Sequence, residues 1–122
     1  MTSASIQSIA GRVLTSIEFV SDYVQLRFKD ITFSIYTCPA VITKASSQRI
    51  GWGEPGFRDS LCDLLDQEVL GISETNDTIT MQFESSIIEV PLKSPNHPGS
   101  EAALLTDKEG RMVVWRIPPT GA

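Results

Sequence analysis

The sequence contains one histidine and two cysteines, so few side chains can supply nucleophilic, general-base or metal-binding chemistry. Cys38 and Cys62 are separated by 24 positions, which is not the close Cys or His spacing of a zinc site. We therefore expect no metal, no cofactor and two reduced, mostly buried thiols, as in a cytosolic protein. Whether the two thiols pair stays open.

The only histidine, His97, stands in a proline-flanked loop, and Glu101 follows it four positions later. A carboxylate beside the sole histidine is the one acid–base combination that the chain offers without folding contacts. A spacing of four through a loop fixes no geometry, so we expect no catalytic residue. His97 and Glu101 are kept as candidate binding residues, and a weakly hydrolytic domain built on them is an alternative.

Long hydrophobic runs are absent, because no apolar stretch approaches the roughly 18 residues of a membrane-spanning helix. The segment Met1–Ser5 has neither the basic nor the apolar region of a signal peptide, so we expect a cytoplasmic protein without membrane contact. Basic residues are few and dispersed, 10 against 15 acidic ones, for a net charge of −5. This balance argues against nucleic-acid binding, which needs cations to displace phosphate counterions.

What the sequence does contain is enough apolar material for a core: 41% of its 122 residues are hydrophobic, which predicts a single domain over residues 1–122. Alternation of apolar and polar residues predicts a first strand with Val13, Thr15, Ile17 and Phe19 on one face. The same alternation predicts strands over 23–29 and 31–36, joined as an antiparallel meander.

The pattern returns 55 residues later, which suggests an internal duplication of a three-strand unit over about 9–37 and 64–92. Asp22 matches Asp77 at the turns, and Phe28 matches Phe83 at the strand ends. Between the copies, Lys44–Gly56 is polar and rich in glycine and is predicted to be a loop. Its glycines lack the neighbouring Lys and Ser/Thr of a phosphate-binding loop.

One α-helix is predicted near 55–66, because Phe57, Leu61, Leu64 and Leu65 recur at helical spacing after Pro55. The tail adds a hairpin of Ala102–Thr106 and Arg111–Ile117. The expected fold is mainly β, with eight strands: two repeated three-strand antiparallel units and a C-terminal hairpin forming a sandwich or half-open barrel with one helix.

The run Met112–Trp115 is prone to form a strand and carries no charge, so it has to be buried centrally or paired with another chain. A homodimer across this strand is one hypothesis. A structural subunit whose function is its own oligomer is the corresponding alternative function.

Three segments, Asp22–Phe28, Gly56–Cys62 and Ser100–Ala103, carry a resemblance to a group of small, acidic bacterial proteins. In that group a DYVQLxF strand, a GYRDxLC helix start and a GPEA turn recur; here Phe57 replaces the tyrosine and Ser100 the proline. The group is largely without assigned function and is more distantly similar to compact β-rich immunity proteins that accompany bacterial toxins. The resemblance implies a bacterial, β-rich protein, and it offers no chemistry that can be carried over to this sequence.

Two further residues are candidates for binding. Trp52 lies between Gly51 and Gly53, where it can cap the core or project toward a partner. Arg58 can lie on a solvated helix face or anchor a carboxylate such as Glu101.

These observations favour a non-enzymatic cytoplasmic binding protein, of an immunity type, that neutralises a basic, toxin-like partner through its acidic surface. The alternative is a small-ligand-binding domain with a pocket between the 51–56 and 96–101 loops.

Overall fold

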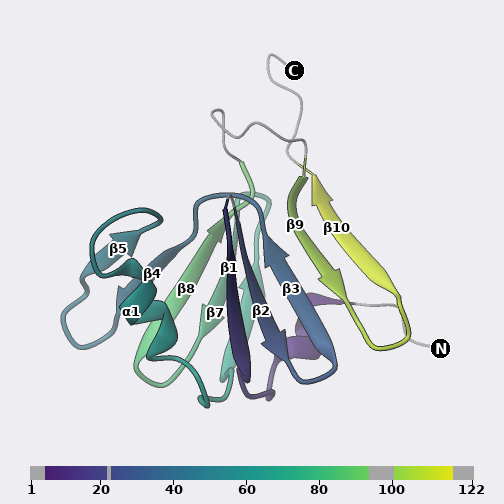
Figure 1. Ribbon diagram of the computed structural model, residues 1–122, viewed down its shortest axis with the longest axis horizontal. Coiled ribbons are helices and arrows are strands. Elements are labelled where there is room, and N and C mark those ends of the chain that lie inside the picture. The colour runs from purple at the N-terminus through teal and green to yellow at the C-terminus, as the bar shows by residue number, and fades with distance from the viewer. Residues whose placement is uncertain (1–4, 22, 94–100, 117–122) are drawn as a thin grey trace.

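The computed structural model describes residues 5–21, 23–93 and 101–116. Ten strands form two five-stranded antiparallel sheets in this part of the chain, and the sheets do not close into a barrel. The first sheet contains, in spatial order, β1 (Ser16–Val20), β2 (Tyr23–Phe28), β3 (Ile31–Ile35), β9 (Glu101–Thr106) and β10 (Met112–Arg116). The second contains β5 (Arg49–Gly51), β4 (Ala40–Thr43), β8 (Ser86–Pro91), β7 (Thr78–Gln82) and β6 (Gly71–Glu74). The mainly β, sandwich-like fold expected from the sequence is confirmed (Figure 1).

One hydrophobic core lies between the two sheets. Strand β2 buries Val24, Leu26 and Phe28 on its inner face and turns its polar residues outward, as the alternation predicted. Strands β7 and β8 bury their own alternate residues, including Met81 and Ile88, in the same cluster. The period of two thus decides which face of each strand joins the core.

The two three-strand meanders have the same register at the offset of 55. Ser16 pairs with Arg27 and Ile17 with Leu26 in β1 and β2. Their counterparts in β6 and β7 are the pairs Gly71 with Gln82 and Ile72 with Met81. The pairings of β2 with β3 and of β7 with β8 correspond in the same way. Common ancestry of the two copies stays a prediction.

Each half of the chain gives a hairpin to the other half's sheet. Strands β4 and β5 follow β3 along the chain, but β4 pairs with β8 in the second sheet. Strands β9 and β10 follow β8, but β9 pairs with β3 in the first sheet. We call this arrangement the hairpin exchange (Figure 1).

Helix α1 (Phe57–Cys62) connects the two halves and packs against β4 and β5, burying Phe57 and Leu61. A single 3-10 turn, η1 (Ile6–Ile9), packs beside β6. The helical part of the described chain contains no segment that is long and apolar enough to cross a bilayer.

Several details of the sequence-based prediction are wrong. The first strand begins at Ser16, and Val13 makes only an isolated bridge to Glu68 and is 41% exposed. The segment 44–56 is not purely a loop, because Arg49–Gly51 pairs with β4. Neither β4 nor β5 was predicted, so the described residues hold ten strands rather than eight. Neither strand shows a long alternation, because β4 is short and β5 has three residues.

The α-helix and the cysteines also differ from expectation. The helix ends at Cys62, four residues earlier than predicted, and Leu65 lies exposed in the turns that follow. Cys38 and Cys62 are free thiols and are exposed rather than mostly buried. Cys38 lies in the crossing between the sheets and Cys62 at the last position of α1, and neither place faces the core.

Candidate functional site

The segment between β5 and α1 folds into a tight loop that presents Trp52. The carboxylate of Glu54 accepts a hydrogen bond from the backbone N–H of Gly51 at 2.6 Å. A Cβ atom at Gly51 would lie 2.9 Å from that carboxylate oxygen, so any other residue here would make the Glu54 side chain shift. Gly56, with φ of 89°, turns the chain into α1 through the left-handed region. The Gly51–Glu54 hydrogen bond and the turn at Gly56 thus determine the position of Trp52.

The indole of Trp52 packs edge-on against Phe57, with ring centroids 5.7 Å apart, and it rests against the core while remaining partly exposed. It therefore caps the core and also reaches the surface. An open pocket of about 430 Å³ lies beside it, lined by Phe19 and Ser21 of the first sheet and by the segment from Trp52 to Asp59.

The cation of this pocket is Arg58. Its guanidinium carbon lies 5.1 Å from the centre of the Phe19 ring, a cation–π contact. Within the described residues Arg58 forms no ion pair, and the indole N–H of Trp52 donates no hydrogen bond. The pocket therefore combines aromatic walls with two donor groups that have no acceptor in the described chain.

Of the four residues proposed from the sequence, Trp52 and Arg58 lie together in this pocket. Glu101 does not join them: it begins β9 and forms an ion pair with Arg116 at 3.7 Å. The suggested pairing of Arg58 with Glu101 is therefore wrong. His97 lies outside the described residues, as does most of the 96–101 loop. Within the described chain, the pocket is bounded by the β1 end instead of Glu101.

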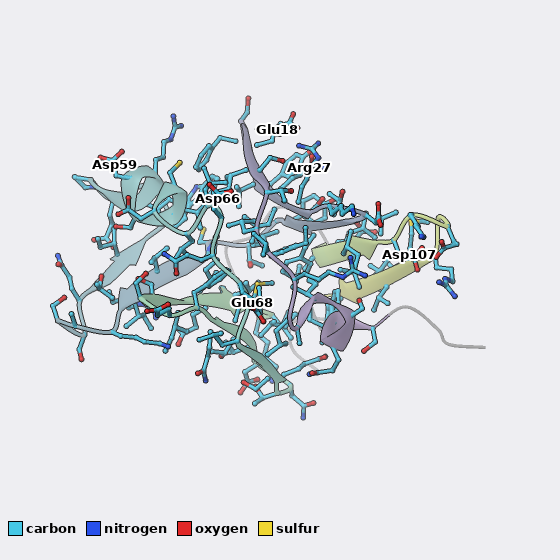
Figure 2. All side chains as sticks on the ribbon, turned by 90° about the horizontal axis from the view of Figure 1, so that it is seen from below. Glu18, Arg27, Asp59, Asp66, Glu68 and Asp107 are labelled. Carbon is cyan, nitrogen blue, oxygen red and sulfur yellow. The ribbon has the colours of Figure 1, made fainter. Side chains whose placement is uncertain are left out.

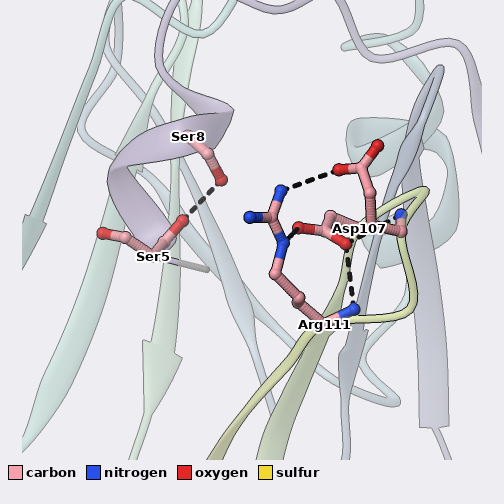
Figure 3. A network of polar contacts seen from close by, with 5 residues as sticks. Ser5, Ser8, Asp107 and Arg111 are labelled. Atoms are coloured by element: carbon pink, nitrogen blue, oxygen red, sulfur yellow. Dashed lines mark hydrogen bonds and ion pairs between the residues drawn. The ribbon is translucent and has the colours of Figure 1, made fainter. Parts of the chain in front are cut away.

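A second pocket, also of about 430 Å³, lies between η1, the β2–β3 turn and the β9–β10 turn. Three of its charged side chains form one network (Figure 3): Arg111 bonds Asp107 at 2.8 Å and Glu109 at 2.7 Å. Burial alone would raise the pKa of Asp107, but hydrogen bonds from the backbone and side chain of Arg111 outweigh it and lower that pKa. The same carboxylates raise the pKa of Arg111. The network therefore stabilises the turn between β9 and β10.

One end of the molecule carries carboxylates without partners. Five carboxylates there are exposed and form no ion pair with another described residue. We call them the acidic end: Asp59, Asp63, Asp66, Glu68 and Glu84. Figure 2, a view from below, shows Asp59, Asp66 and Glu68 along α1 and the segment that follows it. A hydrogen bond of 3.2 Å from Gln67 to Ser85 joins that segment to the turn that carries Glu84.

Two lysines border the acidic end. Lys44 donates to the backbone carbonyl of Phe83, and Lys29 lies in the turn between β2 and β3. Neither forms an ion pair within the described chain. Three other described carboxylates, Asp30, Glu54 and Glu74, also form no ion pair, so the acidic end holds five of the eight described carboxylates without one. More than half of the described carboxylates without an ion pair therefore lie at this end.

Two contributors to the sandwich edges were missed in the sequence. Phe19 was interpreted only as a core residue of the first strand, yet it lines the pocket. Glu74 accepts a hydrogen bond from the indole N–H of Trp115 at 2.8 Å. The repeat pattern could have indicated these two residues, because at the offset of 55 the apolar Phe19 corresponds to the charged Glu74.

Among the described residues, no group of three or more His, Cys, Asp or Glu side chains is arranged to hold a metal ion. The chain matches no protein-family model, and no curated protein and no solved structure shows significant similarity to it. The structure thus defines a β-rich, sandwich-like protein with one open aromatic pocket and one acidic end, and a function has to be argued from those two features.

Proposed function

We propose that the protein is a non-enzymatic binding protein that takes up a basic protein partner at the acidic end. The observation that carries this proposal is the set of five exposed carboxylates without ion-pair partners in the described chain. Six other acidic side chains form ion pairs with arginine or lysine and contribute little attraction to a partner. The acidic end therefore supplies the long-range field that would steer a basic surface toward it.

The resemblance to small bacterial proteins gives the partner a more specific form. A compact acidic protein that resembles immunity proteins would neutralise a basic toxin in the cytoplasm by covering its cationic surface. Such surfaces are common on proteins that act on nucleic acids, because they have to displace phosphate counterions. A cytoplasmic immunity-type role is the form of the proposal that we adopt.

The test compares two variants of equal net charge. The face variant carries Asp63→Asn, Asp66→Asn, Glu68→Gln and Glu84→Gln, and it leaves Asp59, which also borders the pocket, unchanged. The control variant removes four carboxylates that already have partners: Glu18→Gln, Asp77→Asn, Glu89→Gln and Glu109→Gln. Each tagged protein is used to capture partners from lysate of the source organism at low and high salt, and captured proteins are identified by mass spectrometry.

We expect one basic protein to be retained by the wild type and by the control variant, and to be lost from the face variant. With the purified partner, calorimetry should show a Kd at least about tenfold weaker for the face variant at low ionic strength, with the difference shrinking as salt screens the charges. Equal binding by both variants would contradict the role of the acidic end. Retention of no basic protein at any salt concentration would contradict the proposal itself.

A second candidate function, a homo-oligomer, rests on the exposed edge of β10. This strand pairs with β9 on one side and is the last strand of its sheet within the described chain. Met112 is 63% exposed on it, and Val114 is partly exposed on the outer face. An edge strand whose Met112–Trp115 run carries no charge can add the same strand of a second copy.

The dimer is tested by light scattering of the wild type and of a Val114→Lys variant, which places a charge on the outer face of the edge strand. A dimer in the wild type and a monomer in the variant would support it. A wild-type mass of 13.4 kDa at micromolar concentration would exclude it.

A further inference from the structure

The two tryptophans occupy matching positions at the edges of the two sheets, Trp115 on β10 and Trp52 directly after β5. In each sheet, one strand of the meander pairs with the first strand of the exchanged hairpin, and this strand pairs in turn with the second strand of the hairpin. One residue from each of these three strands forms a row across the sheet. The corresponding rows are Ser34–Leu104–Val114 in the first sheet and Glu89–Ala40–Gly51 in the second. Ser34 and Glu89 correspond at the offset of 55. Trp115 follows the last residue of the first row, and Trp52 follows the last residue of the second.

Each tryptophan lies where an edge strand of one sheet faces an edge strand of the other. Trp115, on β10, donates its indole N–H to the Glu74 carboxylate on β6 at 2.8 Å. The residue on β1 that matches Glu74 is Phe19, and Phe19 lines the pocket beside Trp52. One sandwich edge is thus closed by an indole–carboxylate bond, and the other keeps the indole but has a phenyl ring in the carboxylate's position.

The pocket at Trp52 therefore lacks the acceptor that its counterpart contains. Within the described chain the indole N–H of Trp52 has no hydrogen-bond partner, and the Arg58 guanidinium, which lies over the Phe19 ring, has no anion. We propose that this pocket binds the carboxylate of a small organic acid, which accepts a hydrogen bond from Trp52 and pairs with Arg58. The ligand would supply the group that Glu74 supplies to Trp115.

The remaining walls define the rest of the ligand. Phe19, Trp52 and Phe57 present aromatic surface, and a volume of about 430 Å³ accommodates a small molecule with a flat apolar body. Glu54 and Asp59 also line the pocket, and Glu54 is held by the Gly51 N–H. Two carboxylates in the lining would repel a second negative charge, so the ligand carries a single carboxylate. The class is an aromatic or similarly apolar monocarboxylic acid.

This site shares only Asp59 with the acidic end, and its test does not depend on a protein partner. The probe is phenylacetate, compared with phenylacetamide, which has the same body without the charge, and with acetate, which has the charge without the body. Binding is followed by nitrogen–proton correlation NMR of the two tryptophan indoles, assigned with Trp52→Phe and Trp115→Phe.

We expect phenylacetate to shift the Trp52 indole signal and to leave the Trp115 signal unchanged, with at least about tenfold weaker binding of the amide and of acetate. Arg58→Gln and Trp52→Phe should each weaken phenylacetate binding about tenfold or more, because each removes a donor to a charged acceptor. The matched controls, Arg49→Gln and Trp115→Phe, should bind as the wild type does.

Three results would overturn the proposal: equal binding of the acid and the amide, a shift of the Trp115 indole instead of the Trp52 indole, or no shift at any soluble concentration of phenylacetate. If Arg58→Gln fails to fold, the comparison of phenylacetate and phenylacetamide binding to the wild type still tests the proposal. Loss of binding in the face variant, which keeps Trp52 and Arg58, would also count against the pocket.

Discussion

One buried hydroxyl group lies in the crossing from the first sheet to the second. Thr37, which is 1% exposed, donates its hydroxyl hydrogen to the backbone carbonyl of Pro91 at 2.7 Å. Thr37 follows β3 and Pro91 ends β8, so the bond ties the crossing segment to the sheet that it enters. Thr37→Val keeps the shape and burial of the side chain but removes the donor, and it leaves a carbonyl oxygen facing an apolar group.

A buried acceptor that loses its partner costs about 1–3 kcal/mol of unfolding free energy. With a urea m-value of about 2 kcal/mol/M, the midpoint of unfolding should fall by about 0.5–1.5 M. The assay is equilibrium unfolding in urea followed by tryptophan fluorescence and by circular dichroism, with coincidence of the two transitions as the check on two-state behaviour.

Thr32 gives the matched control. It lies on β3, is partly exposed on the outer face, and its side chain forms no hydrogen bond with another described residue. Thr32→Val should change stability by no more than about 0.5 kcal/mol. The reasoning fails if Thr37→Val is as stable as the wild type, or if Thr32→Val costs as much as Thr37→Val.

Three further predictions test the fold. Gly56→Ala should lower the free energy of unfolding by about 1–2 kcal/mol, because φ of 89° is strained for alanine. Gly71→Ala, with no atom within 4 Å of the added carbon, should change it by no more than about 0.5 kcal/mol. Thermal unfolding measures both variants. Phe83→Ala, which empties a fully buried site, should cost about 3–5 kcal/mol in urea unfolding, and a cost below about 1 kcal/mol would show that Phe83 is not a core residue. The lowered pKa of Asp107 means that its ionised form stabilises the fold above the ordinary value of 3.8 and that this stability is lost as the pH falls through the lowered pKa. Asp107→Asn should therefore weaken the turn at neutral pH and flatten the acid limb of the stability curve, and an unchanged acid limb would count against this role.

Strand identity was accessible from sequence wherever a strand has one face in the core and one in water. Strand β2 is the clearest case, because Val24, Leu26 and Phe28 alternate with polar residues and are all fully buried. Strand β5 was not accessible, because its three residues gain strand geometry only by pairing with β4. Short edge strands depend on tertiary pairing and leave little local pattern.

The candidate site was predicted in part for a similar reason. Trp52 and Arg58 were recognisable as a large aromatic side chain and a cation near a glycine-rich turn. That they share a pocket with Phe19 depends on how the edge of one sheet meets the edge of the other, and no local pattern encodes that contact. The misassigned partner of Arg58 has the same origin, since Glu101 is held at the far hairpin by Arg116.

The hairpin exchange also determines when the nascent chain can reach its final structure. As residues 16–35 leave the ribosome they can form the β1–β2–β3 meander, but the strand that covers the β3 edge is β9, which is synthesised only after β4 to β8. Strand β4 likewise waits for β8, which lies in the second half. A truncated or stalled chain therefore displays an uncovered sheet edge, and such edges are the usual starting points of aggregation. Emergence of the first half is therefore not enough to protect the chain from aggregation, because the β3 edge is covered only after β9 has been synthesised.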